Sequence, residues 1–147
     1  MSQLRELATP FHGRYVKEAP AGKYGDYVAH STVTERALSV VGPYSQSVSH
    51  VIYDGDTVTG VVLRIEVEID GHRVFVEEVG DVENPAQKKT NGARLKDAVS
   101  DAVKRCWMRE GLGLHLWSQG DYFLDKQLDK QAADAQELPG QAALEVD

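Results

Sequence analysis

The residues best suited to chemistry are basic and lie close together in the sequence. Within residues 90–116, the side chains that could bind phosphate are Arg94, Lys96, Lys104, Arg105 and Arg109. Arg and Lys side chains on one element can hold a nucleic-acid backbone through contacts that do not read its sequence. The other interpretation is a solvated helix face whose charges pair along the helix, such as Asp101 with Arg105 at i, i+4. The pattern alone leaves both interpretations open.

Acidic side chains on expected strands suggest a second chemistry. They are Asp54, Asp56, Glu66, Glu68, Glu77, Glu78 and Asp81. Carboxylates on a sheet can hold Mg²⁺ against a phosphate, as in metal-dependent nucleases. Such sites usually place a lysine near the second carboxylate, and the segment 66–68 has none. Because alternating acids are more often the solvated face of a strand, a nuclease is the less favoured alternative.

Motifs for nucleotide cofactors and metals do not occur in the sequence. Neither G-x-x-x-x-G-K-[ST] nor G-x-G-x-x-G is found, so neither an ATP-binding loop nor a dinucleotide fold is supported. The five histidines are scattered without ligand spacing, and the single cysteine cannot build a thiolate site or an intrachain disulfide. We therefore expect no cofactor, no metal site and no catalytic residue.

One amphipathic helix, over residues 91–110, is expected to position the basic side chains. Its apolar arc consists of Leu95, Ala98, Val99, Ala102, Val103 and Cys106. Asn91 can cap the start, and Gly111 can supply the left-handed residue that ends it.

Three segments with strand periodicity precede this helix, at residues 44–53, 57–69 and 72–80. Asp-Gly pairs at 54–55 and 70–71 separate them, and such pairs between alternating runs are strong hairpin signals. The sequence predicts a three-stranded antiparallel meander with one apolar face.

Two further helices are predicted before the strands. A short helix spans residues 2–7, and a loop follows over residues 11–27. Thr32 and Glu35 fit a capping box, so a second helix should begin there and end at Gly42-Pro43. Its expected buried side consists of Val33, Ala37, Leu38 and Val41. Helix, meander and a long covering helix together make an α+β domain.

The 147 residues are sufficient for one domain with a core. We expect this domain over residues 1–130, including a polar helix at 121–130, and an acidic, disordered tail over 131–147. The net charge is −7, but residues 88–110 carry seven basic and three acidic side chains, whereas residues 54–84 carry two and nine. A phosphate backbone responds to the local potential, which extends about 8–10 Å in physiological salt.

The segment ARLKDAVSDAVKRCWMREGLGLHLW resembles a stretch typical of the Rad-fifty-two-type single-strand annealing proteins, which include DdrA-like and phage Sak-like members. The superfamily's helix pattern A-x-[ST]-D-[AG]-[VL]-K-R is matched by residues 98–105, followed by a glycine turn at 111–113 and by Trp117. The order of elements agrees over roughly residues 25–117. The resemblance implies ATP-independent binding and annealing of single-stranded DNA along a basic groove of a ring or filament. In it, Lys104 and Arg105 take the place of the superfamily's basic pair.

One further arginine and two tryptophans are also candidates for contacts with DNA. Eukaryotic members contact DNA through an arginine on the first core helix, where this chain has Thr32, so nearby Arg36 is the candidate replacement. Either Trp107 or Trp117 could stack on a base, although packing in a core or subunit contact is the commoner role.

We therefore expect a non-enzymatic, cytoplasmic protein of phage or bacterial recombination or DNA repair. Its expected DNA-binding residues are Lys104, Arg105, Arg94, Lys96, Arg109 and Arg36. The expected partners are single-stranded DNA and further copies of the chain, with a host single-strand-binding protein as another candidate and no membrane. The alternatives are a protein-interaction module whose basic helix docks on an acidic partner and, less favoured, the Mg²⁺-dependent nuclease.

Overall fold

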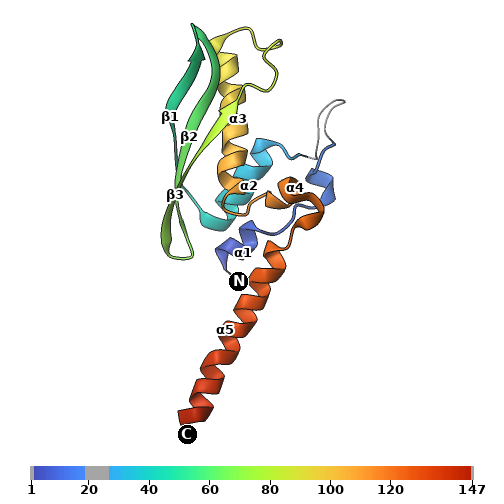
Figure 1. Cartoon of the computed structure of the whole chain (residues 1–147), viewed down its shortest axis with the longest axis vertical. Helices are drawn as coiled ribbons and strands as arrows, with labels where there is room; N and C mark the ends of the chain where they lie inside the picture. Colours follow the sequence, from blue (N-terminus) through green and yellow to red (C-terminus); the bar gives the residue numbers. More distant parts are fainter. Residues whose placement is uncertain (1, 19–26, 147) are drawn as a thin grey trace.

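The structure is a computed structural model that describes residues 2–18 and 27–146 (Figure 1). It is an α+β fold, as predicted, in which one long helix covers one face of a three-stranded sheet. The elements are α1 (Gln3–Leu7), η1 (Gly13–Tyr15), α2 (His30–Val41), β1 (Ser45–Asp54), β2 (Thr57–Ile69), β3 (His72–Asp81), α3 (Asn91–Met108), α4 (Leu114–Ser118), η2 (Gln119–Asp121) and α5 (Leu124–Val146). Among the described residues, no helix is long and apolar enough to cross a membrane.

The sheet is the predicted antiparallel meander, in the order β1-β2-β3. Asp70 and Gly71 turn the chain between β2 and β3 with φ of 52° and 80°, which is why an Asp-Gly pair suits this position. The pairing of β1 with β2 shifts register twice, between Val48 and His50 and between Ile52 and Tyr53.

The core lies between the sheet and α3. Alternate residues of β2 are buried, and the apolar arc of α3 packs on β2 and β3. The buried residues of the two elements are Val61, Leu63, Ile65, Val67, Ile69, Ala98, Ala102, Val103, Cys106 and Trp107. Each large aliphatic side chain buried in this way contributes about 1.5–3 kcal/mol. β1 lies at the edge of the sheet and is largely exposed, so its backbone edge stays open.

The N-terminus of α3 differs in detail from the expectation. Thr90, and not Asn91, is the N-cap, and its hydroxyl accepts a hydrogen bond from Ala93 N at 3.1 Å. Asn91 joins the helix to the first hairpin instead, because its amide nitrogen donates to Asp56 O at 2.8 Å and its oxygen accepts from Val58 N at 3.1 Å. The helix is thereby fixed to the sheet at its first turn.

The predicted capping box of α2 is wrong. The helix begins at His30, two residues before Thr32, and its N-cap Ala29 has no side-chain cap. Leu38, expected in the core, is 49% exposed. Val33 and Ala37 are buried as predicted, and Gly42 ends the helix with φ of 74°. The apolar arc of α2 is therefore narrower than its sequence suggested.

The N-terminal segment contacts the region where α5 begins. α1 occupies the predicted position, and Arg5 contacts Asp129 of α5 through two hydrogen bonds of 2.8 and 3.2 Å. The hydroxyl of Tyr122 donates to Ala8 O. α5 starts at Leu124 and continues through the segment for which composition predicted disorder, extending away from the sheet (Figure 1). That segment is rich in Ala, Gln and Glu, which are good helix formers.

Candidate nucleic-acid interface

The surface of α3 that faces away from the sheet carries two lysines. Lys96 is exposed, and Lys104 lies two turns further along the same helix. Neither lysine forms an ion pair within the part of the chain that the structure describes. The Nζ atom of Lys104 lies 5.8 Å from the ring centroid of Tyr27, which is 38% exposed. Both ammonium groups are therefore placed to meet an anion from solvent.

Arg105 is positioned by a buried carboxylate. Its Nε donates to Asp101 Oδ2 at 3.0 Å, which is the i, i+4 pair expected on the solvated-face interpretation. Asp101 is only 5% exposed, and the same oxygen accepts a hydrogen bond from Asp81 N at 3.0 Å. The guanidinium group also lies 4.9 Å from the ring centroid of Trp117. Among the described residues, the terminal nitrogens of Arg105 have no hydrogen-bond partner. The pair thus holds Arg105 in place while its two outer nitrogens stay available.

Arg94 and Arg109, two further expected DNA-binding residues, have partners within the protein. Arg94 donates to the carbonyls of Val58 and Pro85, both at 3.2 Å. Arg109 forms an ion pair with Glu78 at 2.8 Å. These contacts join α3 to the strands and to the loop that precedes α3, so neither side chain is free of partners within the protein.

Arg36 lies apart from α3, at the junction between α2 and the N-terminal segment. It donates to Thr9 O at 2.8 Å, and its guanidinium lies 4.5 Å from the ring centroid of Phe11. Burial lowers the pKa of this arginine. The structure therefore brings Lys104 and Arg105 together on one surface and places Arg36 elsewhere.

Two aromatic residues belong to this surface, and sequence reasoning did not assign them there. Tyr27 lay at the end of an expected loop, and the commoner expectation for Trp117 was packing in a core or at a subunit contact, with base stacking as the alternative. The signal for Trp117 was its position after the glycine turn, where Gly111 and Gly113, with φ of 89° and 77°, turn the chain between α3 and α4. We call Lys104, Arg105, Tyr27 and Trp117 the basic-aromatic face, and Lys96 lies nearer the start of α3.

Carboxylates border the basic-aromatic face on the side of β3. Asp97 Oδ2 accepts hydrogen bonds from Glu83 N at 2.7 Å and from Asn84 N at 3.4 Å. Partial burial and the neighbouring Asp101 raise the pKa of Glu83, while Lys104 lowers it. Within residues 2–18 and 27–146, no group of three or more His, Cys, Asp or Glu side chains is arranged to hold a metal ion. The acids of this region therefore serve mainly to hold backbone amides and Arg105.

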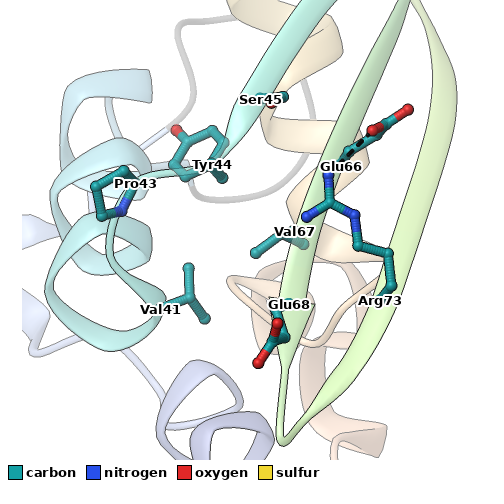
Figure 2. A pocket seen from close by; sticks show the side chains of 8 residues that line it. All are labelled: Val41, Pro43, Tyr44, Ser45, Glu66, Val67, Glu68 and Arg73. Carbon is teal, nitrogen blue, oxygen red and sulfur yellow. Dashed lines mark hydrogen bonds and ion pairs between the residues drawn. The ribbon is translucent and has the colours of Figure 1, made fainter.

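A pocket of about 350 Å³ lies elsewhere, where α2 ends and β1 begins. Figure 2 shows its lining residues, which are Val41, Pro43, Tyr44, Ser45, Glu66, Val67, Glu68 and Arg73. Glu66 forms ion pairs with Arg64 at 2.9 Å and with Arg73 at 3.2 Å, so its charge is already balanced. None of the expected DNA-binding residues lines this pocket.

His115 connects α4 to the N-terminal segment and is partly buried there. Its Nε2 accepts a hydrogen bond from Phe11 N at 3.3 Å. Burial lowers the pKa of His115 below 6.5, and nearby Arg36 lowers it further, whereas Asp125 opposes this shift. The unfolded chain binds the proton more readily, so the stabilisation is present above about pH 6.5 and is lost as the pH falls below it.

We expect the free energy of unfolding to decrease between pH 7.5 and pH 5, as measured by urea denaturation at each pH. His115→Gln should flatten this dependence, because glutamine keeps an acceptor and does not titrate. The matched control is His72→Gln, at an exposed position in β3. An unchanged slope in His115→Gln would assign the acid sensitivity to other groups.

Comparison with known proteins assigns no function to this chain. The sequence matches no model of a known protein family. No curated protein sequence matches it either.

Proposed function

We propose that this protein binds single-stranded DNA and anneals complementary strands without ATP, in the manner of the Rad-fifty-two-type proteins that its α3 sequence resembles. The observation that supports this best is the arrangement of Arg105. Asp101 fixes its Nε, the two outer nitrogens have no hydrogen-bond partner among the described residues, and Lys104 is the preceding residue of the helix. A guanidinium held in this way can bind a phosphate through two parallel hydrogen bonds with little loss of side-chain entropy.

The charge distribution is compatible with this role in spite of the net charge of −7. Lys96 and Lys104 lie on the exposed side of α3, while Arg109 and Arg105 use acids on β3 and α3 as partners. The potential near the exposed side of α3 therefore depends on local lysines more than on the acids of α5, since charges further apart than about 8–10 Å are largely screened. Phosphate contacts leave base edges available to test a second strand.

An assembly of several copies, as a ring or filament, is part of the proposal. Among the described residues, one protomer places two cationic side chains, Lys104 and Arg105, on the basic-aromatic face, so a long strand needs several such faces in series. The open backbone edge of β1 and the exposed side chains of Val48 and Tyr53 provide surface for contacts between copies.

The test uses the two lysines, because a substitution of Arg105 would also affect the stability of the fold. Its removal would leave the buried Asp101 without a counter-charge, which costs more than the roughly 0–1 kcal/mol of an exposed ion pair. Lys96→Ala/Lys104→Ala should weaken binding of a fluorescent single-stranded oligonucleotide of mixed sequence. Since each lost phosphate contact removes about 0.7 from the slope of log affinity against log salt, the slope should flatten by about 1.4. Fluorescence anisotropy over a series of salt concentrations measures both quantities.

The matched control is Lys126→Ala/Lys130→Ala, which removes the same charge from two exposed positions of α5. Thermal melting and light scattering should show that both variants keep the fold and the assembly size of the wild type. Equal affinity and slope in the Lys96/Lys104 variant and the control would contradict the proposal. A wild-type protein that binds no oligonucleotide at low salt would favour a module that docks on an acidic protein.

A further inference from the structure

We infer that Trp117 is a base-stacking residue, and that Tyr27 provides a second ring, so that the basic-aromatic face binds the bases of a single strand as well as its phosphates. This inference rests on the proposed function. It differs from the expectation that Trp117 would pack in a core or at a subunit contact.

The exposure of Trp117 is the first observation. The residue is 48% exposed even though the Arg105 guanidinium lies 4.9 Å from its ring centroid. About half of the residue thus stays accessible to solvent with the cation next to the ring. A flat base can stack on that surface without displacing Arg105.

The position of Trp117 is fixed by the turn that precedes it. Leu112 is buried in the core between the two glycines that reverse the chain, and its backbone nitrogen donates to Trp107 O at 3.1 Å. Gly113 lies against the ring of Phe11. Since α4 starts directly after this turn, the indole is presented from an anchored segment and needs little ordering to bind.

The order of side chains across the face is the second observation. Tyr27 lies beside Lys104, Lys104 precedes Arg105 on α3, and Arg105 lies beside Trp117. Two cations flanked by two exposed rings provide charge for phosphates between two surfaces on which bases can stack. Grooves that combine positive charge with stacking rings are the usual means of binding single strands without sequence preference.

Stacking is compatible with annealing. A stacked base contacts the ring through its flat face, and its pairing edge still points away from the protein. One ring per two or so nucleotides would hold the strand unwound and ordered. A duplex, whose bases are already stacked on each other, could not use these rings.

The test compares two oligonucleotides of equal length and equal phosphate number, one of deoxythymidine and one of abasic sites. Intrinsic fluorescence is selective, because Trp107 is buried and Trp117 is the other of the two tryptophans. Deoxythymidine strands should quench the wild-type fluorescence, and abasic strands should not. Trp117→Ala should weaken binding of the deoxythymidine strand by about 5- to 150-fold, which corresponds to ~1–3 kcal/mol. Its affinity for the abasic strand and its salt slope should match the wild type, and Trp117→Phe should restore most of the lost affinity.

The outcomes separate the inference from the proposed function. If the wild type binds both strands with equal affinity and equal quenching, stacking is overturned while phosphate binding stands. If Trp117→Ala binds the deoxythymidine strand as tightly as the wild type, Trp117 has no role in stacking. If the wild type binds neither strand, the proposed function fails, and the inference fails with it. The fluorescence comparison uses the unaltered chain, so it is decisive even if a variant does not fold.

Discussion

Gly80→Ala is expected to destabilise the domain by about 3 kcal/mol, the upper end of the usual range for an overpacked core. A Cβ atom at Gly80 would collide with Ala98 O, and would lie 2.6 Å from Ala102 N and 2.7 Å from Ala102 Cβ. These atoms belong to the backbone and the first side-chain carbon of α3, so no rotamer change can make room. The strand and the helix would have to move apart along the core. Thermal unfolding should show a melting temperature lower by roughly 6–12 °C, at about 2–4 °C per kcal/mol for a chain of this size.

The chain offers a matched glycine for comparison. Gly92 lies in the first turn of α3, and a Cβ atom there would meet no neighbouring atom within 4 Å. Gly92→Ala should therefore raise stability by about 0.5–1 kcal/mol through helix propensity. If both alanine variants melt at the wild-type temperature, β3 and α3 do not approach each other as closely at Gly80 as the structure shows.

Trp107→Ala is expected to cost about 3–5 kcal/mol, a large part of the 5–15 kcal/mol that stabilises a typical domain. Trp107 is 1% exposed, and its ring meets Tyr44 edge-on at a centroid distance of 5.0 Å. The cavity left by the indole would open between α3 and the start of β1. Urea denaturation should show the loss in the free energy of unfolding.

Two further tryptophan variants serve as controls for the loss of stability in Trp107→Ala. Trp117→Ala removes the same side chain from an exposed position and should cost under about 1 kcal/mol. Trp107→Phe should cost less than Trp107→Ala, because the indole Nε1 is buried without a hydrogen-bond partner among the described residues and phenylalanine removes that donor. Equal losses at positions 107 and 117 would show that the assignment of one ring to the core and the other to the surface is wrong.

The parts of the fold that could be predicted depend on local signals. The two hairpins follow from Asp-Gly pairs between alternating runs, and α3 follows from a wide apolar arc. The helix ends at Met108, two residues before the predicted end, and the left-handed Gly111 lies in the turn that follows. The start of α2 could not be placed from Thr32 and Glu35, because residues upstream of a capping motif can extend a helix when no residue stops it. The exposure of Leu38 depends on which neighbours reach α2, and that information is not local.

The candidate site could be predicted only in part, for a related reason. The pairing of Arg105 with Asp101 is a helical-spacing effect and was visible in the sequence. Arg94 instead contacts the carbonyl of Val58, 36 residues away, and Arg36 contacts that of Thr9, 27 residues away. Backbone carbonyls leave no sequence signature, so side chains that bind them look like unpaired surface charges. Trp107 and Trp117 likewise had the same expected role, and only the folded structure shows that the first is buried and the second exposed.

The two register shifts of β1 have a consequence for how the protein behaves at high concentration. A regular ten-residue edge would act as a template on which any extended chain could align and aggregate. The first shift leaves Ser49 of β1 without a partner and the second leaves Thr59 of β2 without one, so the pairing that orders β1 is regular only over short stretches. A strand that extends this sheet must bend at the same places. The interruptions therefore favour a partner of matching shape over indiscriminate growth of fibrils.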